Sequence, residues 1–480
     1  MKRIILFVLC FFFLFCTFGC TQEEVEDTDM ITLRWMIPGK TPEDLPLVTE
    51  KINEITTKKI GARVEFQYVD TGAYQEKMEG YMATAYEYDL AFGGAYNTLI
   101  NAASKGGILS LDEMIQKHPK LKEAIPDYAW ELTKYNGEIY GVPNLQVLPM
   151  VYAVSCEKRW LEKIGGFDPY SINKLDDIEP YFEAAMRYFE ENGIENVVPF
   201  TPLKNRIGPI VFGYCDIYDK VDNVMFIKDD KGEWKGKIMW ETPEFQRGVK
   251  RLYEWYKKGY IREDILEEKT NISQIVNLTI YKPGIETNYL GQGFSTSCQL
   301  VQKPVIEWCA AMTYIGKDSQ NPELAMKLIE LVNTDKELYN LITLGIEGVH
   351  YEKTGENTFR YIGSSNDNKY FVNAGWKFGN QFNEYIQEGA DLTVWEDTME
   401  YNDSAKLTPF AGFSINNENI REELEQIDEI VDSYPVIHLG AANPDDYYDE
   451  FLQKLKEAGA DKVVAEYERQ INEFMKEKLN

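Results

Sequence analysis

The chain has 480 residues, of which 79 are acidic and 50 basic, giving a net charge of −29. At about 150 residues per domain, this length predicts about three domains or two large lobes. A hydrophobic fraction of 44% with 13% aromatic residues excludes a disordered chain, and a surface this acidic disfavours binding to nucleic-acid phosphates or anionic lipid.

The N-terminus has the pattern of an export signal. Lys2 and Arg3 precede an apolar run over residues 4–15, and Gly19-Cys20 follows. The pattern resembles a bacterial lipoprotein signal, which predicts a signal peptide over 1–19 and acylation of Cys20. An uncleaved anchor, or cleavage without a lipid, remains an alternative. Residues 20–30 are acidic and nearly without apolar side chains, so they are expected to form a tether.

Strands and helices alternate in the next 65 residues. Alternating apolar residues predict strands over 31–37, 63–69 and 88–94. Helical spacing predicts helices over 41–60 and 74–85 between them, with Gly61 ending the first. This order is typical of a parallel sheet with crossover helices.

The rest of the chain continues with mixed α and β patterns. Asn136-Gly137 between two short apolar runs predicts a two-residue hairpin, and 143–149 reads as a connecting stretch. Further predicted elements are a strand over 150–154, helices over 157–164, 177–192 and 243–258, a hairpin at 229–232, a helix opening at Asn321, and two amphipathic segments over 447–458 and 461–479.

Sequence motifs for catalysis and metal binding are missing. The chain contains no phosphate loop, no dinucleotide fingerprint and no G-x-S-x-G nucleophile turn. No cofactor and no metal site is therefore predicted. The three histidines are isolated, and no C-x-x-C pair occurs among the four later cysteines, so buried thiols or a disulfide such as Cys298–Cys309 both stay open. The residues concerned are His118, His350, His438, Cys156, Cys215, Cys298 and Cys309.

Aromatic residues recur beside amide side chains in the predicted loops. An aromatic face suits the C–H side of a sugar ring, and amides suit its hydroxyls. Packing of these aromatic residues in cores is the competing interpretation. The pairs are Tyr96-Asn97, Tyr140 with Asn144 and Gln146, Asn288-Tyr289, and 376–382 with Asn380 and Gln381.

Six motifs together resemble one known family. They are residues 88–92 (YDLAF), 136–143 (NGEIYGVP), 321–325 (NPELA), 345–351 (GIEGVHY), 378–382 (FGNQF) and 455–463 (LKEAGADKV). With the lipoprotein-like signal, they resemble the extracellular solute-binding proteins of ABC importers. The closest likeness is to a carbohydrate-type family with an extra C-terminal module.

This resemblance implies an α/β fold of type II periplasmic-binding-protein kind, with two lobes that each hold a mostly parallel sheet. It implies three crossings between the lobes, which we place near 145–150, near 265–272 and near Gly316. Lobe one is then expected over 30–146 and 270–315. Lobe two, with the C-terminal module, is expected over 147–269 and 316–480.

The resemblance also implies a function: capture of a solute, as a monomer, in the cleft between lobes and delivery to a membrane permease. A lipid at Cys20 would hold the protein at the outer face of the cell membrane, with no cofactor and no nucleic acid involved. A sugar or oligosaccharide is the favoured ligand, and a peptide or another solute stays open. The candidate ligand-binding residues are Trp35, Tyr96, Asn97, Asn144, Gln146, Arg206, Trp376, Asn380 and Gln381.

Two other functions are compatible with the sequence. A surface-anchored glycoside hydrolase or lyase needs a pair of carboxylates about 5 to 10 Å apart in an open cleft. A binding protein that works as a sensor or adhesin, without a transporter, is the second.

Overall fold

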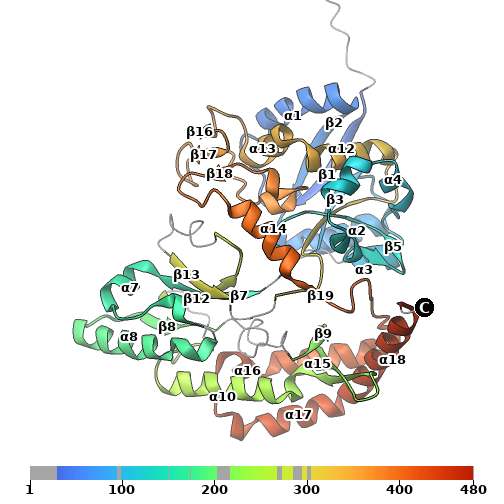
Figure 1. Ribbon diagram of the computed structural model, residues 1–480. Helices are drawn as coiled ribbons and strands as arrows, with labels where there is room; N and C mark the ends of the chain where they lie inside the picture. Colours follow the sequence, from blue (N-terminus) through green and yellow to red (C-terminus); the bar gives the residue numbers. More distant parts are fainter. Residues whose placement is uncertain are drawn as a thin grey trace, which may run out of the picture.

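The computed structural model describes residues 30–94, 99–149, 151–172, 174–202, 217–267, 273–284, 294–299 and 304–478. They form two lobes, with helix α14 (Val394–Ser404) running between them (Figure 1). The predicted signal peptide and Cys20 lie outside the described residues.

Lobe one is built on a five-stranded sheet in the order β2-β1-β3-β15-β6. All strands run in one direction except β15, which is antiparallel to both of its neighbours. Both faces of the sheet are buried: Leu33, Trp35 and Ile37 of β1 lie in one core and Met36 in another. The strands are β1 (Thr32–Pro38), β2 (Arg63–Val69), β3 (Leu90–Gly94), β6 (Val142–Pro143) and β15 (Ala311–Ile315).

Helices from two distant parts of the chain cover this sheet. Helix α1 (Leu45–Ile60) packs beside α12 (Pro322–Thr334) and α13 (Lys336–Leu344) in one core. As predicted, α1 ends where Gly61 takes a left-handed conformation (φ 72°). It begins four residues later than predicted, and Asp44 lies 3.2 Å from His350 Nε2.

The remaining elements of lobe one include the predicted hairpin at Asn136-Gly137 and a small three-stranded sheet, β16-β17-β18. They are α2 (Tyr74–Ala83), α3 (Leu99–Ser104), α4 (Asp112–Gln116), α5 (Pro119–Ala124), α6 (Asp127–Glu131), β4 (Lys134–Tyr135), β5 (Glu138–Ile139), β16 (Tyr351–Lys353), β17 (Thr358–Tyr361), the 3-10 helix η7 (Gly375–Lys377) and β18 (Ile386–Gln387).

Lobe two has a four-stranded sheet in the order β13-β7-β12-β8, in which only β7 runs against the other strands. An antiparallel sheet β11-β10-β9 adjoins it. The strands are β7 (Tyr152–Glu157), β8 (Val197–Phe200), β9 (Asp219–Val221), β10 (Val224–Lys228), β11 (Trp234–Ile238), β12 (Ser273–Ile280) and β13 (Phe294–Gln299). The helices are α7 (Lys158–Ile164), α8 (Glu179–Asn192) and α10 (Pro243–Lys257).

The C-terminal module, defined here as residues 409–478, shares one core with lobe two. Phe410, Phe451 and Tyr467 lie in the same buried cluster as Trp240 and Trp255. Helix α18 also covers the edge of β11, because Asn472 exchanges hydrogen bonds of 3.0 Å with the backbone N–H and C=O of Trp234. The module helices are α15 (Arg421–Ser433), α16 (Val436–Leu439), α17 (Tyr448–Glu457) and α18 (Ala460–Lys478).

The crossings between lobes differ in part from those expected. The first follows β6, as placed, but β12 and β13 belong to the lobe-two sheet, so the chain returns to lobe one only after residue 299, at β14 (Val305–Ile306). Helices α12 and α13 then pack on lobe one, and the last crossing lies at β19 (Lys406–Leu407). By sheet and core membership, lobe one therefore includes 311–404 and lobe two includes 273–299, unlike the expected division.

Cys156 and Cys309 are both buried, and the Cys309 thiol is not in a disulfide, so the Cys298–Cys309 alternative is excluded. In the part of the chain that the structure describes, no three His, Cys, Asp or Glu side chains gather as a metal site. No helix there combines the length and the apolar character needed to cross a bilayer.

Candidate ligand-binding site

The carboxyl ends of the parallel strands in lobe one meet at one edge of the sheet. Strands β1, β3 and β6 end there, at Pro38, Gly94 and Pro143, and the reversed β15 begins there. Ligands of open α/β sheets bind at such an edge. Because the first linker to lobe two leaves from β6, this edge faces the space between the lobes (Figure 1).

Trp308 stands at this edge and was not singled out from the sequence. It lies in the segment that returns from lobe two, three residues before β15, and 41% of the residue is exposed. The segment passes close to the end of β3, because a Cβ on Gly94 (φ 104°) would lie 2.4 Å from the carbonyl oxygen of Ala310. An exposed tryptophan in a chain of predominantly buried tryptophans is the signal that identifies it.

Trp376, a predicted site residue, lies at the same edge. Its half-buried ring meets Phe92 of β3 edge to face, with ring centroids 5.7 Å apart. The next residue, Lys377, donates a hydrogen bond of 2.7 Å to the carbonyl oxygen of Pro38, and burial lowers the pKa of its ammonium. The 3-10 helix η7 is thereby held against the end of β1, which fixes the Trp376 ring.

Two predicted site residues are structural instead. Trp35 is 1% exposed and stacks on Phe66 within the core, because both faces of the sheet are covered. Asn144 is fully buried: its Nδ2 donates to the Lys377 carbonyl at 2.8 Å, and its Oδ1 accepts from Thr313 at 3.0 Å. Neither side chain is free to meet a ligand in this arrangement.

The other predicted residues gather around the first linker or lie outside the described residues. The Gln146 carbonyl accepts from Asn402, Asn380 caps the turn at Phe382, and Gln381 donates to Glu384 at 3.2 Å. The structure thus brings Asn144, Gln146, Trp376, Asn380 and Gln381 into one neighbourhood, with Trp376 at the sheet edge. Tyr96, Asn97 and Arg206 are not among the described residues.

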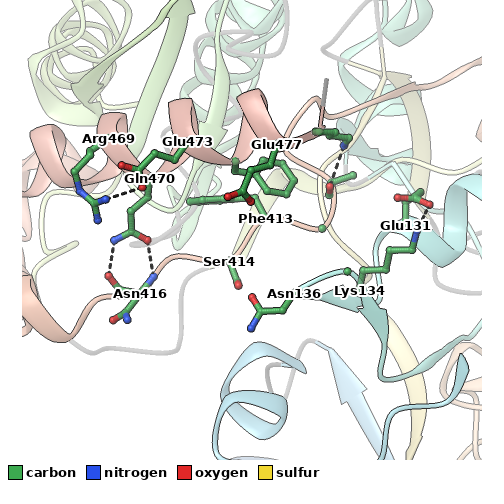
Figure 2. A pocket seen from close by; sticks show the side chains of 15 residues that line it. Glu131, Lys134, Asn136, Phe413, Ser414, Asn416, Arg469, Gln470, Glu473 and Glu477 are labelled. Carbon is green, nitrogen blue, oxygen red and sulfur yellow. Dashed lines mark hydrogen bonds and ion pairs between the residues drawn. The ribbon is translucent and has the colours of Figure 1, made fainter. Parts of the chain in front are cut away.

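A pocket of about 700 Å³ lies between lobe one and the C-terminal module (Figure 2). Lobe one contributes Glu131, Lys134 and the hairpin tip at Asn136-Gly137, and the module contributes residues of its first segment and of α18. Asn136 and Ser414 point toward each other across it (Figure 2). Sequence analysis predicted the hairpin but not this pocket, since the pocket depends on how the module docks.

The charges of this pocket are largely neutralised from within. Lys134 pairs with Glu131 at 2.5 Å, and Arg469 pairs with Glu466 and Glu473 along α18. Gln470 exchanges hydrogen bonds with the Asn416 backbone. The polar groups that remain suit a neutral, hydroxyl-rich ligand better than a strongly charged one.

The hairpin whose tip lines this pocket is packed into the core beneath the sheet edge. Tyr135 and Tyr140 of the hairpin pack in the same cluster as Phe92 and Trp376. A ligand that reaches from the edge to the module would therefore contact both lobes. Differential contact with two lobes is the means by which a ligand stabilises a closed form.

Comparison with known proteins shows similarity along most of the chain. A family model described as "Domain of unknown function (DUF3502)" matches residues 409–476. The "Carbohydrate ABC transporter substrate-binding protein" of Streptococcus pneumoniae serotype 4 (strain ATCC BAA-334 / TIGR4) is 27% identical, over 96% of this chain and 94% of that protein.

Solved structures agree with this relative. The N-glycan transport solute binding protein NgtS of Streptococcus pneumoniae matches 93% of this chain and 100% of its own, at 26% identity and a TM-score of 0.80. An extracellular solute-binding protein of Bifidobacterium longum subsp. infantis, 15% identical, matches 92% of this chain and 98% of its own with a TM-score of 0.62, which shows the shared fold.

The fold therefore defines a two-lobed solute-binding protein, confirming the predicted fold class. More particularly, the chain is similar along most of its length to a carbohydrate ABC-transporter substrate-binding protein and to NgtS, and its C-terminal residues 409–476 match the DUF3502 model. The named relatives are binding proteins, which confirms the prediction of a binding protein rather than an enzyme.

Proposed function

We propose that this protein captures an oligosaccharide between its lobes and delivers it to an ABC permease. The observation that carries the proposal is the match over 93% of the chain to NgtS, which has been solved with Man1GlcNAc and with Man5GlcNAc. Glycans of mannose and N-acetylglucosamine are therefore the first ligand class to test. Trp308 and Trp376 at the sheet edge would supply aromatic faces for sugar rings.

The similarity to NgtS differs between its structures with and without a glycan, which concerns the closing of the two lobes on a ligand. The TM-score is 0.80 for NgtS named without a ligand, 0.72 for the Man1GlcNAc complex and 0.69 for the Man5GlcNAc complex. Since the compared protein is the same, these differences reflect its conformation. The arrangement of this chain is more similar to the NgtS structure named without a glycan, which supports a cycle in which a glycan shifts the lobes toward another arrangement.

The position of the protein in the cell is part of the proposal. An N-terminal signal over 1–19 and a lipid at Cys20 would tether it to the outer face of the membrane through residues 20–30. A tether raises the effective concentration of the protein near its permease. Detergent phase partitioning tests this: the exported protein should enter the detergent phase and its Cys20→Ser variant the aqueous phase, whereas equal partitioning would contradict the anchor.

Thermal unfolding of the purified protein against a glycan panel tests capture. A ligand that binds only the native state raises the unfolding midpoint by mass action. We expect a rise with mannose- and N-acetylglucosamine-containing glycans, with no product formed. No rise with any glycan of the panel would contradict the carbohydrate assignment.

Two variants locate the site. Trp308→Ala and Trp376→Ala should each weaken glycan binding about tenfold or more, because stacking on a sugar is lost. Tyr170→Ala is the control, since Tyr170 is an aromatic residue that is 63% exposed in a 3-10 helix of lobe two and does not line the pocket of Figure 2. An equal loss in the control variant would argue against a site at the sheet edge.

A further inference from the structure

A second pocket has a volume of about 540 Å³. All of its lining residues but one belong to lobe one. Strands β17 and β18, the start of α14 and the segments that connect them form its wall. Lys282, which follows strand β12 of lobe two, completes it. We call it the β17–α14 pocket. It shares no lining residue with the pocket of Figure 2.

Aromatic rings line the β17–α14 pocket. Tyr361, Phe371, Tyr385 and Trp395 are all half-buried, so each presents part of its ring to the space. The Trp395 ring is fixed by a hydrogen bond of 2.8 Å from its Nε1 to the carbonyl oxygen of Glu384. Tyr361 and Phe371 hold each other, with ring centroids 4.7 Å apart. Rigid aromatic faces of this kind suit the C–H face of a sugar ring.

An ammonium and a carboxylate face the same pocket without touching. Glu384 accepts a hydrogen bond of 3.2 Å from Gln381. Lys282 feels the Glu384 charge, yet among the described residues it has no ion pair within 4.0 Å and no hydrogen bond. Burial lowers the pKa of Lys282 and raises that of Glu384 to about 7. Two half-buried polar groups that line one pocket without bonding to each other leave a donor and an acceptor available to a ligand.

A hydroxyl group is the chemical group that fits between them. It donates its hydrogen to a carboxylate and accepts from an ammonium through its lone pairs. A carboxylate ligand would be repelled by ionised Glu384, and an ammonium ligand by Lys282. Arg360 also lines the pocket, but its guanidinium is ion-paired with Glu352 and Glu388. The pocket is thus matched to a neutral polyhydroxyl ring, and its volume lies within the usual range of about 300–1,000 Å³ for small-molecule sites.

We propose that the β17–α14 pocket is a second carbohydrate site, in which a neutral sugar ring lies on the aromatic faces and places a hydroxyl between Lys282 and Glu384. The inference rests on the proposed function for the class of ligand, but it concerns a different set of residues. It also gives the site a position between lobes, because Lys282 comes from the segment that follows lobe-two strand β12.

The test separates the two sites by their residues. Binding of mannose, N-acetylglucosamine and Man1GlcNAc is measured by ligand-observed NMR titration on the full protein and on Glu384→Gln, Lys282→Gln and Trp376→Ala. We expect two classes of site. Glu384→Gln and Lys282→Gln should each weaken binding at the β17–α14 pocket about tenfold, which is the usual effect of losing a hydrogen bond to a charged group. Trp376→Ala should weaken binding at the sheet edge of lobe one.

Glu400→Gln is the matched control, because Glu400 is exposed on α14, the helix whose start lines the pocket, and does not line the pocket itself. Hydrogen exchange of the unmodified protein adds a readout that needs no variant: sugar should protect peptides around 359–361 and 384–395. A single site that is lost in Trp376→Ala and intact in Glu384→Gln, with no such protection, would overturn this inference and leave the proposed function standing. Binding lost in Glu384→Gln and intact in Trp376→Ala would support the pocket and overturn the cleft site.

Discussion

Asn402 of α14 holds the first linker between the lobes with a single side chain. Its Nδ2 donates to the Gln146 carbonyl at 2.7 Å, and its Oδ1 accepts from the Leu148 amide at 2.9 Å. Asn402 and Leu148 are both 2% exposed. The amide thus satisfies two backbone groups that water reaches poorly.

Asn402→Ala should therefore lower the free energy of unfolding by about 2 to 4 kcal/mol, since two hydrogen bonds are lost and the Leu148 amide stays buried. Urea unfolding measures this loss. Asn192→Ala is the control, because the exposed Asn192 side chain donates one hydrogen bond to Tyr188 within the same helix. Equal losses in the two variants would show that Asn402 does not hold the linker.

Glu384 should make stability depend on pH. Its ordinary pKa of 4.5 is raised to about 7 in the folded protein, chiefly by burial. The charged or polar groups around it are Lys282, Tyr339, Tyr361 and Gln381. The folded state keeps a proton that the unfolded state releases, so the free energy of unfolding should fall as pH rises from about 4.5 to about 7. At about 1.4 kcal/mol per pKa unit, the fall is at most about 3.5 kcal/mol.

Denaturant unfolding at pH 4.5, 6 and 8 measures this dependence, and the Glu384→Gln variant isolates it. The difference in unfolding free energy between the unmodified protein and the variant should change by this amount across the range. A difference that is constant with pH would contradict a raised pKa at Glu384.

At the scale of elements, a glycine of the C-terminal module allows helix α16 to pack closely against helix α10 of lobe two. Gly440 ends α16 with φ 73°, and a Cβ there would lie 2.6 Å from the Leu252 carbonyl oxygen of α10. Gly193 ends α8 in a similar left-handed conformation, φ 60°, with nothing within 4 Å of such a Cβ. Substitution at Gly193 would therefore cause backbone strain alone, whereas substitution at Gly440 would cause the same strain and a steric clash as well.

Gly440→Ala should lower the free energy of unfolding by at least about 2 kcal/mol more than Gly193→Ala. Both variants carry the cost of about 1 kcal/mol for a left-handed alanine, and only the first forces α16 away from α10. Thermal unfolding of the two variants decides it. Similar losses would mean that α16 moves aside at little cost.

Helix ends and local turns could be read from the sequence, while long-range pairing could not. Gly61 ends α1, and Asn136-Gly137 forms the hairpin, because both depend on the local backbone. The sequence around β12 is equally compatible with either lobe, since pairing with β7 is set by strands more than 100 residues away. The second and third crossings between the lobes depend on such pairing, and the structure places them at other residues than the sequence predicted.

The same division between local and long-range information applies to the residues of the candidate site. Trp376 could be found because an aromatic beside amides is a local pattern. Trp35 alternates like any strand residue, and only the helices on both faces of the sheet reveal that it is in the core. Asn144 has the side chain of a ligand contact, but its partners Lys377 and Thr313 come from segments far along the chain.

At the scale of the whole molecule, the C-terminal module completes the core of lobe two. A chain that ends at residue 408 would lose Phe410 and Phe451, which pack on Trp234 and Trp240, and would expose these two tryptophans. We expect trypsin to digest residues 151–299 of that shortened chain rapidly, while the lobe-one segments resist. Limited proteolysis with mass spectrometry measures this against the full chain. Equal resistance of 151–299 in both chains would show that lobe two folds without the module.

Each lobe draws its core from segments separated by the other lobe, and this has a consequence for the order of events during synthesis. Chains emerge from the ribosome at about 5–20 residues per second. Strand β15 is made long after β1, and α18 closes the edge of β11 with nearly the last residues of the chain. Neither lobe can reach its final packing until most of the polypeptide exists. The growing chain therefore stays incompletely folded through most of its translation.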